Sequence, residues 1–321
     1  MTSLVFLSGR WKLGLLLAAT TAIMWGVLPI ALKGIMQTLD PVTTTFFRFA
    51  IAAIIITPYL MARNKLVNKH KFSSPKLFLQ LLCAGMLLTA NYALYIFGLE
   101  RTTAEAAQVM MQLAPVLLIL AGVWIFKEHF SPGQWIGFAT FVSGLLMFFS
   151  PRFDDIFTHL NDYGIGLLML ASAAITWVGY AVIQKLLIKE FNAEETMLVF
   201  YWIGALAFLP FSNFSLLADL TLLQWTLVIF CGLNTLIAYG CFSEALMHIE
   251  ASRVSAVIAM TPLITVFFVQ SVPFAGVVAE SIGLVTIIGA IFVVCGSVVT
   301  ATMKNKTSTS GLRNCRKKSR H

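Results

Sequence analysis

One arginine within a long apolar stretch carries the strongest chemical signal in this sequence. Arg48 lies seven residues into the hydrophobic run 41–61. If that run crosses a membrane, burying the charge costs about 3 kcal/mol or more, so such a residue is seldom kept without a reason. Its guanidinium can hold a carboxylate or phosphate through paired N–H donors. The alternative is structural, because the long stem can carry the charge to the membrane interface or tie helix ends together.

Neutral polar residues recur at helical spacing and form further candidates for a binding cavity. Gln108, Gln112 and Pro115 follow an i, i+4, i+7 pattern, so they share one stripe of a helix. Ser255 and Pro262 repeat this stripe 147 residues later. Each proline removes a backbone donor and frees a carbonyl one turn earlier, which a membrane tolerates only beside protein or a wet cavity. The structural alternative is a glutamine that hydrogen-bonds a neighbouring helix.

A second set of candidates combines aromatic residues with one asparagine. It comprises Trp25, Asn91, Tyr92, Tyr95, Trp177 and Tyr239. Asn91 and Tyr95 lie one helical turn apart, while the two tryptophans occupy matching places in the two halves of the chain. Such side chains can stack on an apolar or aromatic substrate. They can equally pack a helix bundle or mark the membrane interface. From its apolar character alone, Leu118 is expected to face lipid.

Acidic and metal-binding residues are sparse in the apolar runs. Glu244, near the end of the run 222–246, is the candidate for coupling transport to an ion, and a cap or loop ion pair is its alternative role. The five histidines fall outside the runs, and the five cysteines show no CxxC spacing. The sequence therefore predicts no metal site, no cofactor and no disulfide. The absence of a GxxxxGK[ST] loop argues against an ATP-driven pump.

Membrane-spanning helices must position these residues. Of 321 residues, 59% are hydrophobic and 11% are charged, and the apolar runs are near twenty residues long. A helix of about 20 residues crosses the hydrocarbon core of a bilayer. We expect spans at about 13–32, 41–61, 77–99, 104–126, 134–150, 164–185, 196–212, 222–246, 251–271 and 281–302.

The ten predicted spans form two internal copies. A shift of 152 residues pairs Trp25 with Trp177, and a shift of 147 pairs Pro115 with Pro262. Five spans per copy is an odd number, so the second copy must enter the bilayer from the opposite side. The sequence thus predicts an all-α polytopic membrane protein with two inverted five-helix repeats, 13–150 and 164–302. A basic, disordered tail follows at 303–321.

The net charge of +8 reports topology rather than a nucleic-acid partner, because the basic residues sit in loops and the tail beside the spans. Cytoplasmic loops carry the excess of lysine and arginine in membrane proteins. Both termini are therefore expected in the cytoplasm. The lipid bilayer and a small-molecule substrate are the expected partners, and the sequence leaves open whether the chain forms a homodimer.

Several stretches resemble the drug/metabolite transporter superfamily, specifically the EamA-type ten-span carriers of the bacterial inner membrane. They are ATTAIMWGVLPIALK, FFRFAIAAII, TAEAAQVMMQLAPVLLILAGVWIFKEHF and ASRVSAVIAMTPLITVFF. The amino-acid sequence of these stretches is most similar to the YhbE-like branch of that family. The resemblance implies two inverted bundles around a central cavity, and transport of small metabolites such as amino acids and their derivatives.

Residues and resemblance together predict a secondary transporter rather than an enzyme. Export of a small amphipathic metabolite by alternating access is the leading interpretation. A membrane enzyme acting on lipid-linked substrates is an alternative that would need a His/Asp pair or a carboxylate cluster at one membrane face. A structural or sensory membrane protein is a third interpretation, and it would not require cavity residues at symmetric places.

Overall fold

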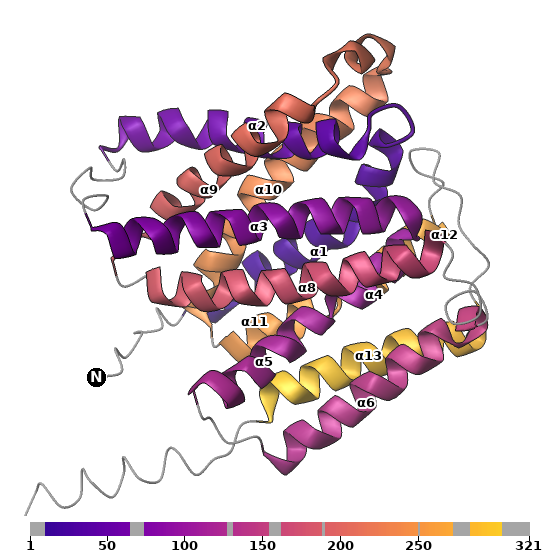
Figure 1. Cartoon of the computed structure of the whole chain (residues 1–321). Coiled ribbons are helices and arrows are strands. Elements are labelled where there is room, and N and C mark those ends of the chain that lie inside the picture. Colours follow the sequence, from indigo (N-terminus) through magenta and orange to yellow (C-terminus); the bar gives the residue numbers. More distant parts are fainter. Residues whose placement is uncertain are drawn as a thin grey trace, which may run out of the picture.

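A computed structural model describes residues 10–64, 74–126, 131–153, 162–187, 190–249, 251–271 and 283–303 (Figure 1). Within these ranges, helices and short 3₁₀ turns are the only regular structure. Nine segments of this part are long and apolar enough to cross a membrane, and Ala104–Leu118 forms a shorter apolar segment. The prediction of an all-α membrane protein is confirmed.

Each predicted span corresponds to a helix or to a pair of helices. In the first copy these are α1 (Trp11–Ile35), α2 (Pro41–Ala62), α3 (Pro75–Arg101), α4 (Ala104–Met111), α5 (Leu113–Phe126) and α6 (Pro132–Phe149). In the second copy they are α8 (Asp162–Leu187), α9 (Ala193–Phe208), α10 (Leu222–His248), α11 (Ala251–Ile258), α12 (Thr261–Ser271) and α13 (Leu284–Thr302). The 3₁₀ turns are Ser150–Arg152, Leu209–Phe211 and Phe214–Asp219. Helix ends lie within four residues of the predicted bounds.

The fourth span of each copy is a broken helix, and the break lies at the matching place. The α4–α5 helix is interrupted at Gln112, and α11–α12 at Ala259 and Met260. The N–H groups of Gln112 and Met260 donate to the carbonyls three residues earlier, at 3.1 and 3.2 Å. Pro115 and Pro262 follow each break and lack the N–H that would continue the helical ladder. The prolines therefore account for both interruptions.

The helices of the two copies pack against one another in a symmetric pattern. In Figure 1, α3 lies along α8, and α6 lies along α13. Exchanging the two copies turns the α3–α8 contact into the α1–α10 contact, and both are present. The α5–α8 contact has its counterpart in α1–α12, and the α3–α9 contact in α2–α10. Each of these helix–helix interfaces between the copies therefore occurs twice, with the roles of the two copies exchanged.

Helix direction shows that the second copy is inverted. Gly137 and Gly144 on α6 meet Gly296 and Gly289 on α13, respectively. Residue numbers therefore rise along α6 as they fall along α13, so these two helices are antiparallel. The α3–α8 pair is also antiparallel, since Asn91 and Gly98 on α3 meet Ala173 and Gly166 on α8. The α1–α10 pair is antiparallel through Met24 with Asn234 and Gly34 with Gln224. The matching helices α6 and α13 thus point in opposite directions, as expected for the inverted arrangement predicted from the odd number of spans.

The α6–α13 interface depends on glycines that bring the two backbones together. A Cβ atom at Gly144 would lie 2.5 Å from the Val293 nitrogen, and one at Gly289 would lie 2.5 Å from the Phe148 nitrogen. Both neighbours are backbone atoms, so neither can rotate away. Small residues permit this close approach of helices in membranes, where packing drives association.

Replacing Gly144 with alanine is expected to destabilise the protein by about 1–3 kcal/mol, because the added methyl group must push α6 and α13 apart. Thermal unfolding of the purified protein in detergent measures the effect. Gly240→Ala in α10 is the matched control, since a Cβ there meets no atom within 4 Å. That control should be neutral or slightly stabilising, as alanine is the better helix former. Equal unfolding midpoints for the two variants would contradict this packing.

Candidate functional site

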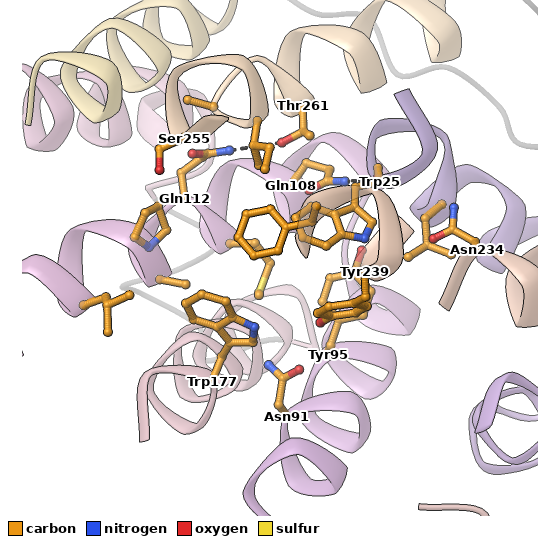
Figure 2. Close-up of a pocket in the computed structure, with 18 of the residues that line it drawn as sticks. Trp25, Asn91, Tyr95, Gln108, Gln112, Trp177, Asn234, Tyr239, Ser255 and Thr261 are labelled. Atoms are coloured by element: carbon orange, nitrogen blue, oxygen red, sulfur yellow. Dashed lines mark hydrogen bonds between the residues drawn. The ribbon is translucent and has the colours of Figure 1, made fainter. Parts of the chain in front are cut away.

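A cavity of about 590 Å³ lies between the two copies (Figure 2). Its lining comes from α1, α2, α3, the broken helices α4–α5 and α11–α12, and α8, α10 and α13. Of the cavity residues predicted from the sequence, all but Pro262 line it, namely Trp25, Arg48, Asn91, Tyr92, Tyr95, Gln108, Gln112, Pro115, Trp177, Tyr239 and Ser255. Residues scattered over more than two hundred positions are thus brought to one place by the repeat symmetry.

Most lining residues occur as symmetry-related pairs. Besides the tryptophan pair Trp25 and Trp177, the shift of 147 residues relates further members of the lining. These pairs are Tyr92 with Tyr239, Tyr95 with Phe242, Gln108 with Ser255, Met111 with Ile258, Gln112 with Ala259, and Ala114 with Thr261. The cavity therefore lies on the pseudo-two-fold axis, where both copies contribute the same helix faces.

Both glutamines of the broken helix line the cavity and also tie that helix to its neighbours. The Gln108 amide donates to the Trp25 carbonyl on α1. The Gln112 amide donates to the Thr261 hydroxyl at 3.1 Å and accepts from the Ser297 hydroxyl at 3.3 Å. Gln112 thus links the break in the first copy to the start of α12 and to α13. The interhelical hydrogen bond, which was the structural alternative for these residues, is present in both cases.

Aromatic side chains form much of the cavity wall. Trp25 meets the Tyr239 ring edge-on at 5.3 Å between centroids, and the Phe242 ring at 5.9 Å. Figure 2 shows Trp177 reaching into the same space from α8. Aromatic faces of this kind can enclose an apolar or planar part of a ligand.

Arg48 is buried beside the cavity instead of reaching the membrane interface. Its side chain is 4% exposed, and its guanidinium carbon lies 4.4 Å from the centre of the Tyr92 ring. Its Nε and Nη1 atoms have no hydrogen-bond partner among the residues that the structure describes. The position that matches Arg48 in the second copy is Phe200, which is fully buried and packs on Tyr180. The positive charge of Arg48 therefore has no counterpart at the matching position of the second copy.

Three polar lining residues were not predicted, namely Asn234 and Thr235 on α10 and Thr261 on α12. The Asn234 amide nitrogen donates to the Met24 carbonyl at 2.7 Å, while its Oδ1 atom has no partner within the described ranges. The repeat gave no signal here, because the matching residue of the first copy is Leu87. An asparagine in the middle of the apolar run 222–246 was the feature that could have revealed it.

Two expectations, for Pro262 and Leu118, need correction. Pro262 is buried in α12 but does not line the cavity, because the helix restarts so that Thr261 faces it instead. Glu244 is not among the lining residues, and its side chain is 55% exposed and lies 3.3 Å from His248 Nε2, as its ion-pair alternative requires; its part in coupling stays a prediction. Leu118, expected to face lipid, lines the cavity. Across the described residues, no group of three or more histidine, cysteine or acidic side chains is arranged to hold a metal ion.

The cavity is closed on one side of the bundle. There, Ile30 of α1, Ala104 of α4 and Val269 of α12 are buried together, with Phe268 packed against them. On the side where α1 begins and α13 ends, the lining extends to Ala301 in the last turn of α13. We call these the closed face and the terminal face.

Comparison with known proteins identifies the family. The profile of the EamA-like transporter family matches the chain twice, at residues 12–150 and 164–302. The chain belongs to the EamA-like transporter family. The resemblance seen in the sequence is thereby confirmed, and so is the expectation of a transporter rather than an enzyme.

Relatives extend over nearly the whole chain. The inner membrane transporter YhbE of Escherichia coli is 36% identical over 292 residues, which cover 90% of this chain and 91% of YhbE. A transporter of Haemophilus influenzae is 35% identical over 293 residues, covering 90% and 94%. The pseudopaline exporter CntI of Pseudomonas aeruginosa is 22% identical over 257 residues, covering 80% and 85%.

A solved crystal structure supports the fold independently. It superimposes with a TM-score of 0.63 at 18% sequence identity, covering 91% of this chain and 98% of the other. At this identity the likeness concerns the arrangement of the helices and not the ligand.

Proposed function

We propose that this EamA-family protein is a secondary transporter that exports small amphipathic metabolites across the bacterial inner membrane, with both termini in the cytoplasm. The observation that carries the proposal is the cavity between the two inverted copies, lined by both broken helices. Transporters built from inverted repeats place their substrate there, beside discontinuous helices. The broken helices of the repeats 13–150 and 164–302 move against each other around this cavity, while α6 and α13 stay packed together.

The broken helices are the moving parts in this proposal. The α4 and α12 halves meet on the closed face, and the Gln112–Thr261 hydrogen bond joins the two breaks. A break in the backbone ladder allows one half of a helix to tilt while the other half stays packed. Separation of α4 from α12 would open the cavity toward the closed face. Closure near Ala301 would seal the terminal face.

Export is the proposed direction because a relative is named as an exporter of a small metabolite, and because the terminal face, toward which the cavity lining extends, would be cytoplasmic. A lysine and arginine excess in the segments on that side supports the orientation. In this state the cavity would receive substrate from inside the cell.

Comparing exported metabolites tests the function and does not require the substrate to be identified first. Cells that overexpress the protein, cells that lack it and cells that express an Arg48→Gln variant are compared for metabolites inside and outside. We expect at least one small metabolite to rise outside on overexpression and to accumulate inside on deletion. Identical profiles in the overexpressing and deleted strains, under conditions where the protein is abundant, would contradict the proposal.

A further inference from the structure

Three consecutive backbone carbonyls of α1, at residues 24–26, accept hydrogen bonds from the side chains of three other helices. In chain order, the donors are the Asn234 amide of α10 at 2.7 Å, the Gln108 amide of α4, and the Thr265 hydroxyl of α12 at 2.6 Å. We call residues 24–26 the α1 hub. The α4 and α12 half-helices meet on the closed face, so the hub ties both of them to a single turn of α1.

A proline and a glycine make this turn of α1 a suitable acceptor. Pro29 lies within α1 and has no N–H to bond to the Trp25 carbonyl, so the Gln108 amide supplies the missing donor. Gly26 allows α12 to approach closely, because a Cβ atom there would lie 2.6 Å from Ile264 Cγ2. The hub therefore depends on residue types that are chosen for backbone access.

The second copy has few of these features. The shift of 152 residues places the hub on residues 176–178 of α8, where Ala181 and Val178 occupy the positions of Pro29 and Gly26. The shift of 147 residues gives the positions that match the three donors, which are Leu87 for Asn234, Ser255 for Gln108 and Leu118 for Thr265. Leucine has no side-chain hydrogen-bond donor. At most one of the three bonds can therefore form in the second copy.

The breaks of the two helices show the same asymmetry. The Gln112 amide donates to the Thr261 hydroxyl at 3.1 Å and joins the two breaks. The residues that match this pair are Ala259 and Ala114, whose side chains cannot form a hydrogen bond. The bonds that hold α4 and α12 together thus cannot all form between the matching half-helices, α11 and α5. Closing one face of the cavity and closing the other therefore differ in free energy.

We propose that the α1 hub is a one-sided latch that keeps the closed face shut while the cavity is empty. Thr265 is its positioning residue: it is fully buried and is not among the lining residues, so it acts on the gate through α12 and not by touching substrate. Because the terminal face has no equivalent latch, the empty protein rests with the closed face shut. This proposal rests on the proposed transport function and adds to it the identity of the resting state.

The reaction rate of a cavity cysteine measures the latch. Ser255→Cys is placed in a background without the five native cysteines, and a membrane-impermeant thiol reagent is applied to one face of sealed vesicles without added substrate. The rate from the closed face reports how much of the time that face is open. It should be lower than the rate from the terminal face.

Thr265→Val removes the hydroxyl and keeps a branched side chain. With this change, the closed-face rate should rise about threefold, which is the population shift produced by losing an average interhelical hydrogen bond of about 0.6 kcal/mol. The terminal-face rate should stay unchanged. Thr265→Ser keeps the hydroxyl and should react at the original rate. Thr89→Val is the matched control, because the Thr89 hydroxyl is also buried but bonds to the Gly85 carbonyl of its own helix at 2.8 Å. That control should leave both rates unchanged.

Four outcomes would overturn the latch. They are an unchanged closed-face rate in Thr265→Val, an equal rise in Thr89→Val, a rise that Thr265→Ser shares, and a starting rate from the closed face that equals the rate from the terminal face. If Thr265→Val does not fold, Gln108→Ser decides the case in the same assay. This change installs the residue of the second copy and leaves the Trp25 carbonyl to water, so it should raise the closed-face rate at least threefold; an unchanged rate refutes the latch.

The assay needs no substrate, so failure of the latch and failure of transport are distinguishable. Unchanged access in the hub variants, with metabolite export intact, refutes the latch alone. Access that responds to Thr265→Val as expected, without any exported metabolite, supports the latch and refutes the transport function.

Discussion

Bridging Ala104 to Val269 is expected to abolish transport. Both residues are buried in one cluster on the closed face, where α4 and α12 meet. In the double variant Ala104→Cys/Val269→Cys, a short bifunctional thiol reagent that reduction can cleave would hold these half-helices together. The cavity could then no longer open on that face. Export should fall to the level of the deletion strain and return after reduction.

A second pair controls for the effect of any bridge. A Cβ atom at Gly133 on α6 would lie 3.0 Å from the Met303 Cβ at the end of α13. The glycine contacts make α6 and α13 one tightly packed unit, so Gly133→Cys/Met303→Cys should bridge without loss of transport. Both variants are built in a background without the five native cysteines. Full export by the bridged Ala104–Val269 protein would contradict a gate formed by α4 and α12.

Removing both helix-breaking prolines is expected to reduce transport at least tenfold while stabilising the folded protein. In Pro115→Ala/Pro262→Ala, each alanine restores an N–H that can bond to the carbonyl of Met111 or Ile258. A proline costs about 3 kcal/mol relative to alanine in a helix interior and less in a first turn, where Pro115 and Pro262 lie, so the straightened helices should be modestly more stable. A continuous helix cannot bend at the break. Unfolding midpoints in detergent and export by cells measure the two effects.

Pro58→Ala is the matched control for this change. Pro58 also lies within a span, α2, but on the exposed surface and with no break in the helix. Its replacement should leave export unchanged. A double proline variant that exports at the wild-type rate would show that the breaks serve helix packing and not gating.

The fold was predictable because few physical rules determine it. Hydrocarbon thickness sets the length of an apolar helix, so runs near twenty residues marked the helices closely. The paired tryptophans and prolines revealed the repeat, and an odd number of spans then required inversion. The same symmetry brought Trp25 and Trp177 to one cavity. A position seen twice in the chain is thus the most reliable pointer to the site.

Positions without a counterpart in the other copy were the harder ones. Asn234 is matched by Leu87, so the repeat could not reveal it. Leu118 follows Pro115 by three residues and continues the cavity stripe, but its apolar character suggested lipid contact. The rotation of α12 after its break, which turns Thr261 rather than Pro262 to the cavity, depends on local backbone geometry that spacing alone does not encode.

Access of water to the cavity from each membrane face tests alternating access most directly. A membrane-impermeant thiol reagent is applied to one face or the other of sealed vesicles carrying Ser255→Cys, a lining position, or Ile175→Cys, a position that is 61% exposed on the outer surface of α8. We predict that Ser255→Cys reacts from both membrane faces. Once Ala104 and Val269 are bridged, Ser255→Cys should react only from the terminal face. Ile175→Cys should react from neither face. Reaction of Ser255→Cys from one face alone, with or without the bridge, would contradict transport by alternating access through this cavity.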